Sequence, residues 1–282
     1  MSGVYGLSLG AYQQLREAFR RASGIDLPES KRQLIAGRLH GRLKALGLPD
    51  YDAYVELLAQ PNQAAERQRM IDLLTTNETY FFREPEHFRY LAAEILPKLP
   101  RRPVRVWCAA ASSGEEPYSL AMLLQDKLGD GGWSLLASDL STRVLERASQ
   151  GLYPLQRTDL LPPEYLKRFC LRGTGDYDGH LLIRRELRDR VRFCQHNLLH
   201  SAADLGQFDI IFLRNVLIYF NGATRQQVID RVQRQLRPGG WLVIGHSESL
   251  QGVQNALQLV RPSVYRVPAY FAGAPVELSG VA

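Results

Sequence analysis

Cysteine is scarce in this sequence, and no two cysteines lie close together. Cys108, Cys170 and Cys194 are the three among 282 residues, and the six histidines also lack the spacing of metal ligands. A disulfide framework or a zinc cluster is therefore not expected, and we expect no bound metal. Free thiols are typical of a reducing compartment, which points to the cytoplasm.

Long hydrophobic runs are also missing. The most apolar stretch, residues 208–220, is interrupted by Asp209, Arg214 and Asn215, whereas a membrane-spanning helix needs about 18 or more consecutive apolar residues. The first ten residues lack the basic segment and the apolar segment of a secretory signal. We therefore expect no insertion into a membrane.

Several common catalytic motifs are absent too. The chain has no GxGxxG turn of dinucleotide-binding dehydrogenases, no Walker A loop and no GxSxG elbow of hydrolases. Its composition, with 45% apolar and 23% charged residues, is that of an ordinary globular protein. The net charge of +6 favours an acidic partner, and nucleic acid, an anionic membrane or a carboxylate-rich protein would all fit it.

Two kinds of hydrophobic periodicity divide the chain. From Tyr12 to Leu74 apolar residues recur at intervals of three and four, which predicts an all-helical N-terminal domain over residues 1–75. Residues 76–102 form a linker that includes an amphipathic helix. From residue 103 short apolar runs alternate with helical patterns, which predicts a doubly wound α/β domain over residues 103–282.

One segment interrupts this alternation, at about residues 155–190. Two short apolar runs flank a glycine-rich stretch at 173–179, which predicts a hairpin. We interpret the segment as a small antiparallel β subdomain inserted in the α/β domain. Further along, we expect a turn at residues 237–240 and a last strand near residues 264–267.

Acidic side chains follow the first two strands of the α/β domain. Glu115 begins the helix after the small-residue turn at 109–114, where it can meet a cationic group or merely favour a helix N-terminus. Asp139 ends the second strand, where it can accept the hydroxyls of a ribose or cap a helix. Because no phosphate-binding loop lies nearby, we infer a nucleoside ligand without phosphates, and S-adenosylmethionine (SAM) fits.

Polar residues also follow two later strands and fill the linker. Asn197 and Leu198 can bond the edge and cover the face of an adenine, although an asparagine here can equally form a turn. Arg214 and Asn215 lie in an apolar run and need buried partners, at a binding site or in a structural ion pair. Residues 75–84 combine hydroxyls, an amide, aromatics and an arginine, which also fits a helix cap beside core aromatics.

Together these segments closely resemble the chemotaxis receptor methyltransferase family, CheR. The resemblance lies in TTNETYFFRE at 75–84, WCAAASSGEEPYSLA at 107–121, ASD at 137–139, NLL at 197–199, FLRNVLIYF at 212–220, LRPGG at 236–240 and GHSE at 245–248. Their order and spacing cover almost the whole chain. The resemblance implies an N-terminal helical domain and a SAM-dependent methyltransferase domain that carries a small antiparallel β subdomain.

The resemblance also implies which residues do the chemistry. The implied SAM site consists of Asn77, Thr79, Arg83, Glu115, Asp139, Asn197, Leu198, Arg214 and Asn215. Arg83 and Tyr219 are implied to be catalytic residues near the transferred methyl group. The implied reaction moves that group to glutamate γ-carboxylates of chemoreceptors, giving methyl esters and S-adenosylhomocysteine, for adaptation in chemotaxis. A glutamate is already an anion at neutral pH, so no catalytic base is needed.

A basic helix is the first candidate surface for the receptor. Lys31, Arg38 and Arg42 are spaced by seven and four residues, which places them on one helical face, and no acidic residue lies between residues 31 and 44. We expect this face to dock the acidic methylation helix of a chemoreceptor, unless it is merely a solvated surface.

The glycine-rich loop is the second candidate surface. Gly173, Gly175 and Gly179 form a loop similar to the type that, in this family, tethers a C-terminal pentapeptide of some receptors. An extended peptide could add as a strand to the exposed edge of the hairpin.

Two other functions fit parts of the sequence. A SAM-dependent methyltransferase of a small molecule or RNA would use the same cofactor site but leaves the hairpin and the acid-free helix unexplained. A SAM-binding adaptor would bind without turnover, and the intact Arg83 and Tyr219 argue against it. We expect a monomer that has no nucleic-acid partner.

Overall fold

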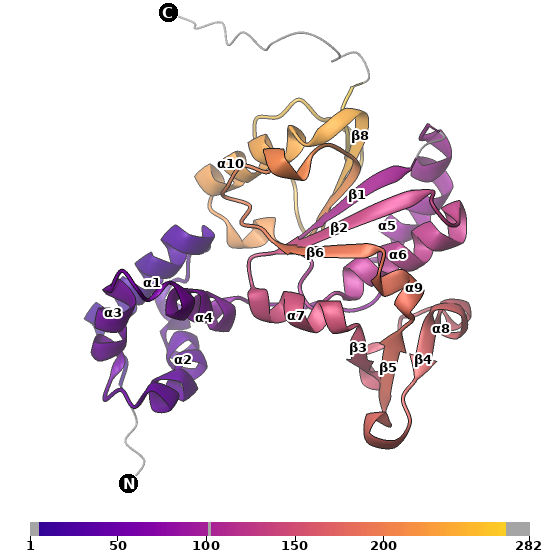
Figure 1. The fold of residues 1–282 in the computed structure, drawn as a ribbon. Helices are drawn as coiled ribbons and strands as arrows, with labels where there is room; N and C mark the ends of the chain where they lie inside the picture. The colour runs from indigo at the N-terminus through magenta and orange to yellow at the C-terminus, as the bar shows by residue number, and fades with distance from the viewer. Residues whose placement is uncertain (1–5, 101–102, 269–282) are drawn as a thin grey trace, which may run out of the picture.

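The computed structural model describes residues 6–100 and 103–268 (Figure 1). Residues 1–5 lie outside the described residues, and they are half of the ten residues in which we found no secretory signal. Residues 269–282, the last part of the expected α/β domain, also lie outside the described residues. Among the described residues, no helix is long and apolar enough to cross a membrane.

The N-terminal domain consists of four helices around their own apolar core. They are α1 (Leu9–Ser23), α2 (Arg32–Leu46), α3 (Tyr51–Ala59) and α4 (Ala64–Leu74), with a short turn η1 (Glu29–Lys31) before α2. The helices begin and end where side chains satisfy their free backbone groups. Ser8 accepts a hydrogen bond from the Ala11 N–H at 3.0 Å, and Gly24 ends α1 in the left-handed conformation. Tyr12, Phe19 and Leu39 are fully or almost fully buried between the helices.

A seven-stranded sheet forms the centre of the second domain. Its order is β6 (Val191–Gln195), β2 (Trp133–Asp139), β1 (Val104–Ala109), β7 (Phe208–Leu213), β8 (Leu236–Ile244), β10 (Val264–Arg266) and β9 (Gln258–Arg261). The first five strands run parallel, and β10 and β9 are antiparallel. The strand order reverses between β1 and β7, and ligands bind at such a point beyond the carboxyl ends of the strands.

Helices cover both faces of this sheet. On one face Phe88 of α5 (Pro85–Tyr90) and Tyr118 of α6 (Glu115–Leu128) belong to the same apolar cluster as Phe212. On the other face Val228 of α10 (Gly222–Gln233) packs in a second cluster with Trp107. After α5 the chain continues through the π-helical turn η2 (Leu91–Ile95) and η3 (Leu96–Lys98). The expected doubly wound α/β architecture is confirmed.

The inserted segment forms a second, three-stranded sheet. Its antiparallel order is β3 (Leu152–Pro154), β5 (His180–Ile183) and β4 (Cys170–Arg172). The turns η4 (Leu155–Arg157) and η5 (Gly175–Tyr177) and the helices α8 (Pro163–Phe169) and α9 (Arg185–Arg188) complete it. Figure 1 shows this small sheet projecting from the domain beside α7 (Thr142–Gln150). The expected hairpin is present, and β3 extends the sheet to residues before 155.

The end of the domain differs from two sequence expectations. Residues 237–240 do not form a free turn, because they lie within β8, where the pairing register with β7 shifts. Strand β9 was not expected, since its four residues are all exposed and carry no alternating apolar pattern. Only its pairing with β10 makes this segment a strand.

Partly buried polar contacts join the helical domain to the α/β domain. The Asp72 carboxylate of α4 accepts hydrogen bonds from the backbone N–H and the hydroxyl of Thr142, each at 2.9 Å, at the start of α7. The Asn197 amide donates to the Ala22 carbonyl at 2.7 Å, and Ile25 pairs with Phe220 through a backbone bridge. These contacts fix the helical domain beside the carboxyl ends of the strands.

Gly114 provides a test of the turn between β1 and α6. Its φ is +98°, and an added Cβ would lie 2.6 Å from the Tyr153 hydroxyl and 2.8 Å from the Ala148 Cβ. We expect Gly114→Ala to lower the free energy of unfolding by about 2 to 4 kcal/mol. The alanine would have both the free-energy cost of a strained backbone and that of overpacking. Urea denaturation followed by circular dichroism measures this loss.

Gly131→Ala is the matched control for this variant. Gly131 also has a positive φ of +77°, but nothing lies within 4 Å of its added Cβ. Gly131→Ala should therefore lower the free energy of unfolding only by the cost of the strained backbone. If both variants lower the free energy of unfolding equally, the packing argument for Gly114 is wrong.

Candidate functional site

A concave site with mixed polar and apolar walls lies at the carboxyl ends of the parallel strands. It is a cavity of about 460 Å³, called here the central cavity, and it is lined by the residues that follow β1, β2, β6 and β7. The linker at residues 74–79 and the segment at residues 25–28 of the helical domain close its other sides. The central cavity therefore lies where the reversal of strand order predicts a ligand site.

Arg214 connects the walls of the central cavity. Its side chain has no exposed surface, and it donates to Glu84 Oε2 at 2.9 Å and to the Arg83 carbonyl at 2.6 Å. On its other side it forms an ion pair with Glu116 of α6. Arg214 thus both lines the cavity and makes structural ion pairs, the two roles that the sequence left open.

Glu84 is held ionised by this arrangement. Burial alone would raise its pKa, but the Arg214 charge, together with hydrogen bonds from Arg214, Asn215 and the His246 backbone N–H, lowers the pKa to about 2. Its backbone has φ +55° at the start of α5, a conformation that carries strain for a residue with a side chain. The ion pairs stabilise Glu84 in this position.

Asp139 lies at the end of β2 on the wall of the central cavity, as the sequence predicts. Its Oδ2 accepts from the Ser112 N–H and its Oδ1 from the Ser141 N–H, both at 2.9 Å. Burial raises the pKa of this carboxyl. Each oxygen has a further lone pair, so the carboxylate can still accept bonds from hydroxyl groups of a ligand.

The two neighbouring glutamates after the first turn have different positions. Glu115 is fully buried away from the central cavity, where it accepts from Ser113 at 2.6 Å and pairs with Arg157 at 2.8 Å. Glu116, paired with Arg214, lines the central cavity instead. Glu115 is thus not among the residues that line the central cavity, because one residue along a helix turns a side chain by about 100°.

Asn197 and Leu198 both line the central cavity. The Nδ2 of Asn197 donates to the Ala22 carbonyl, and its Oδ1 accepts from the Leu199 N–H at 2.9 Å. One N–H and one lone pair of the amide have no partner in these two bonds, so the bond to an adenine edge stays a prediction. Leu198 offers an apolar surface, as expected.

The linker residues expected at the cofactor site also lie on this cavity. Asn77, Thr79 and Arg83 line it, opposite Asn215 and Tyr219 from the end of β7 and the turn η7 (Leu217–Tyr219). Arg83 is fixed by a bond to the Glu78 carbonyl at 2.9 Å. Burial raises the pKa of Tyr219, so its hydroxyl remains protonated and can donate.

The three basic residues expected to form a docking face do not share one free surface. Arg42 pairs with the buried Glu66 of α4, its Nε lying 2.9 Å from Oε1, and so satisfies a carboxylate of the domain core. Arg38 turns toward the linker and donates to the Leu74 carbonyl at 2.6 Å. Lys31 lines the central cavity. Partners from other segments therefore bind two of the three side chains, those of Arg38 and Arg42.

The glycine-rich loop connects β4 and β5 at the tip of the small sheet. Gly173 must be a glycine, because an added Cβ would lie 1.9 Å from the Tyr177 carbonyl oxygen. Gly175 and Gly179 have positive φ angles of +60° and +76° and open space around them. Strand β4 is at the edge of its sheet, so its outer side has no neighbouring strand in that sheet.

Two sequence models of one family match the chain over almost all of this structure. The model "CheR methyltransferase, all-alpha domain" matches residues 10–75, and "CheR methyltransferase, SAM binding domain" matches residues 77–266. The chain is 41% identical over 268 residues to the chemotaxis protein methyltransferase of Salmonella typhimurium, covering 94% of this chain and 92% of that protein. It is 43% identical over 258 residues to chemotaxis protein methyltransferase 2 of Pseudomonas aeruginosa, covering 90% and 91%.

The chain belongs to the CheR methyltransferase family. The resemblance drawn from its sequence is confirmed. In this CheR chain the central cavity lies between the SAM-binding domain and the all-alpha domain, and residues of both line it. Its residues fit SAM, since Asp139 can accept ribose hydroxyls, and Leu198, Val216 and Phe220 provide apolar walls for an adenine.

Sequence reasoning missed part of the cavity wall in this CheR protein. Ile25, Leu27, Pro28 and Leu34 from the helical domain line the side opposite the strands. No local pattern assigns these residues to a cofactor site, because they read as ordinary core or loop residues of a helical domain. The capping glycine before them, Gly24, packs so closely on Leu199 that an added Cβ would lie 3.0 Å from its Cδ2.

One group of side chains in the CheR chain has the composition of a metal site. Glu84, His87 and His246 bring their ligand atoms within 4.8 Å of one another. Burial and the nearby Arg214 charge together lower the pKa of His87 to about 3. Since Glu84 is already bonded to Arg214 and Asn215, the same positive charge also opposes a metal cation at this place.

Glu84→Gln tests the ion pairs that hold the linker. We expect the free energy of unfolding at pH 7 to fall by about 2 to 3 kcal/mol, because a carboxylate with a depressed folded pKa stabilises the fold. The folded pKa lies below the unfolded value, so this stabilisation is present above about pH 4.5 and disappears as the pH falls toward 2. Urea denaturation of both proteins at pH 7 and near pH 3 measures the effect.

Glu86→Gln is the control, since Glu86 is exposed and pairs only at the surface with Arg89. Its effect should be within about 0.5 kcal/mol at either pH. If the difference in the free energy of unfolding between the wild type and Glu84→Gln is the same at pH 7 and pH 3, Glu84 does not titrate in this way.

Proposed function

We propose that this CheR chain transfers a methyl group from SAM to glutamate side-chain carboxylates of chemoreceptors, for adaptation in chemotaxis. Its relatives at 41% to 43% identity, over nine-tenths of the chain, are named chemotaxis protein methyltransferases. The observation that carries the proposal for this acceptor is that Arg83 and Tyr219, two side chains that can donate hydrogen bonds to a carboxylate, both line the central cavity. We place this activity in the cytoplasm, without a nucleic-acid partner.

The chemistry needs no proton transfer. When bound, SAM supplies a methyl group on a positively charged sulfur. A carboxylate oxygen of the acceptor forms the new C–O bond as the C–S bond breaks, and the products, an ester and a thioether, are both neutral at the reacting atoms. Because opposite charges disappear, a water-poor cavity favours the transition state over the separated ions. A glutamate is ionised at neutral pH, so alignment is what the protein must provide.

Arg83 and Tyr219 are the residues we assign to that alignment. Both line the central cavity, and the Arg83 charge faces Tyr219 closely enough to affect its ionisation. The Tyr219 hydroxyl is kept protonated by burial, and it can donate one bond to the acceptor carboxylate. A neutral donor orients the nucleophile and removes less of its negative charge than a second cation would.

The other walls fix the cofactor and exclude water. Asp139 and the apolar Leu198 are placed to hold the nucleoside, and Arg214 anchors the linker whose residues Asn77 and Thr79 complete the wall. The carboxylates of Glu116 and Glu84 compensate the Arg214 charge. No strong unpaired charge from Arg214 therefore faces the sulfonium group.

Receptor binding belongs to the same proposal. Lys31 and Arg38 border the central cavity and can meet acidic receptor side chains, while Arg42 contributes through its pair with Glu66 to the shape of α2. The β4 edge beside the glycine-rich loop can accept a receptor C-terminal peptide as an added strand. We expect a monomer to suffice, because all these surfaces lie on one chain.

Methyl transfer from labelled SAM to chemoreceptor-containing membranes, followed by mild alkali, tests the function. We expect label on the receptor that alkali releases as methanol, because carboxyl esters hydrolyse and N-methyl groups do not. A label that resists alkali would contradict the proposed carboxylate acceptor. Membranes lacking chemoreceptors serve as the control and should remain unlabelled.

Tyr219→Phe tests the role of the hydroxyl. We expect kcat to fall by about 10- to 100-fold, because the acceptor carboxylate loses an orienting donor. The dissociation constant for SAM, measured by isothermal titration calorimetry, should stay within about twofold, since the cofactor walls are unchanged. The exposed Tyr177→Phe in the glycine-rich loop is a matched control with unchanged kcat. A Tyr219→Phe enzyme with wild-type kcat would refute the assignment.

A further inference from the structure

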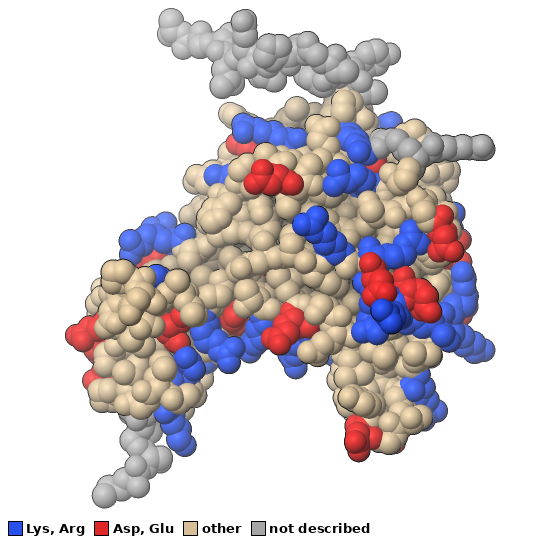
Figure 2. Space-filling model, viewed as in Figure 1, with Lys and Arg blue, Asp and Glu red and all other residues tan. Residues whose placement is uncertain are grey.

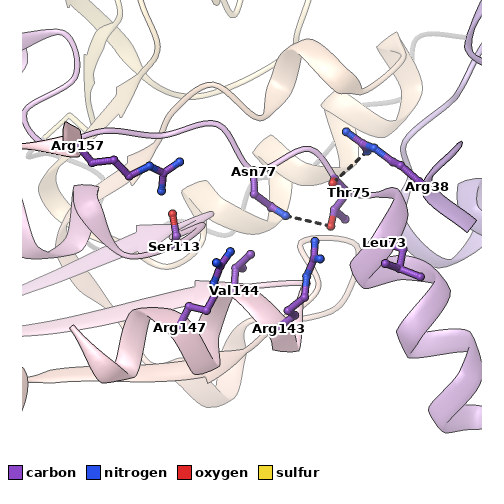
Figure 3. A pocket seen from close by; sticks show the side chains of 9 residues that line it. All are labelled: Arg38, Leu73, Thr75, Asn77, Ser113, Arg143, Val144, Arg147 and Arg157. Atoms are coloured by element: carbon purple, nitrogen blue, oxygen red, sulfur yellow. Dashed lines mark hydrogen bonds between the residues drawn. The ribbon is translucent and has the colours of Figure 1, made fainter. Parts of the chain in front are cut away.

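A second cavity, of about 360 Å³, adjoins the central cavity under the linker. Nine described residues line it: Arg38, Leu73, Thr75, Asn77, Ser113, Arg143, Val144, Arg147 and Arg157. We call it the arginine cavity. Figure 3 shows the guanidinium groups of Arg143 and Arg147 rising from α7, with Arg157 reaching in from one side and Arg38 from the other. Four cations from three segments of the fold therefore converge on one space.

The arginine cavity has too few acidic partners for these cations. None of its nine lining residues is acidic, and the Arg157 partner, Glu115, is a fully buried carboxylate behind the wall. Arg143 donates to the Asp72 carbonyl at 2.9 Å, and its Nε is buried without a hydrogen-bond partner. Arg147 is exposed and makes no hydrogen bond or salt bridge to a described residue, although its charge acts on the same buried Glu115 carboxylate.

This concentration of charge is unfavourable for the fold by itself. Arg143 and Arg147 are four residues apart on α7, where like charges destabilise a helix by a few tenths of a kcal/mol. Burial and the Arg143 charge both lower the pKa of Arg38, which is the sign of mutual repulsion. A bound anion would remove these costs, so the arginine cavity is suited to negatively charged groups.

The position of the arginine cavity indicates which anion it meets. It shares Arg38, Thr75 and Asn77 with the central cavity, so the two form adjoining parts of one surface. Figure 2 shows a notch between the helical domain and the small β sheet, with basic side chains along its border below α7. A partner that places one carboxylate in the central cavity would bring its neighbouring side chains to the arginine cavity.

We propose that the arginine cavity binds acidic side chains that flank the modified glutamate on the acceptor protein. This inference rests on the proposed function and assigns Arg143, Arg147 and Arg157, which that function does not use, to substrate recognition. On a helical acceptor, residues three, four or seven positions away lie on the same face, about 5 to 10 Å along the axis. Carboxylates at those positions, together with the acceptor glutamate, would span the two cavities.

Such recognition separates binding from chemistry. The acidic neighbours bind to permanent cations that do not contact the reacting oxygen, so the acceptor carboxylate keeps its nucleophilic charge. Leu73 and Val144 give the arginine cavity an apolar part that can receive the side-chain stems. The cavity therefore favours glutamates in an acidic helical context over isolated glutamates.

Arg147→Glu is the sharpest test, because Arg147 is exposed and its replacement breaks no hydrogen bond or salt bridge to a described residue. We expect KM for a soluble receptor fragment to rise by about tenfold or more at low salt, with kcat at saturating fragment and the SAM dissociation constant both within about twofold. Arg143→Gln, which removes charge but keeps a hydrogen-bonding side chain, should raise KM by a smaller factor. Arg234→Glu is the matched control: this exposed arginine ends α10, and its reversal changes net charge equally.

A charge exchange on the acceptor identifies the contact. Replacing the flanking acidic residues of the receptor fragment by lysine should raise KM for the wild-type enzyme and lower it for Arg147→Glu. If KM for the receptor fragment is the same in Arg147→Glu and Arg234→Glu, the inference is wrong. The proposed function would still hold in that case, provided that the wild type methylates the fragment. Absence of alkali-labile methylation by the wild type would instead refute the proposed function itself.

A small anion is the competing occupant. Suppose that calorimetry shows inorganic phosphate binding to the wild type but not to Arg147→Glu. If KM for the receptor fragment is then the same in both proteins, the arginine cavity binds a small anion and the inference is wrong. If phosphate acts only as a competitor of the receptor fragment and raises its KM in the wild type but not in Arg147→Glu, the inference is supported.

Discussion

The buried ion pairs of Arg214 are the constraint on which the site depends. A guanidinium without exposed surface is tolerable only with carboxylates around it, and here one comes from the linker, Glu84, and one from α6, Glu116. The bond to the Arg83 carbonyl fixes the linker directly. Through this one side chain the end of β7, the start of α6 and the linker meet, and the linker residues become part of the cavity wall.

The helical domain is part of the site rather than an appendage. Asp72 accepts a hydrogen bond from the start of α7, and Asn197 donates to the Ala22 carbonyl, so partly buried polar contacts join α1, α4 and the sheet domain. As a result, one side of the central cavity is made of helical-domain residues such as Ile25 and Leu34. Cofactor binding and the docking of an acceptor both depend on how this domain is placed.

Charge is distributed differently in the two adjoining cavities. In the central cavity the Arg214 charge is compensated by Glu84 and Glu116, which suits a reaction in which a carboxylate and a sulfonium neutralise each other. In the arginine cavity cations are in excess, which suits recognition by charge. Separate places for the two tasks allow strong electrostatic binding without weakening the nucleophile.

The sequence by itself determined the helical N-terminal part, the doubly wound α/β architecture with its small inserted sheet, and the family, because hydrophobic periods and strand-end motifs are local properties. It also placed Asp139 and Arg214 correctly at the cavity, since strand ends share one edge of a sheet. Tertiary structure alone decided that Glu116 rather than Glu115 lines the cavity, that Arg42 pairs with Glu66, and that four arginines converge. The physical reason is that side-chain partners from distant segments are set by helix rotation and packing, which no local pattern contains.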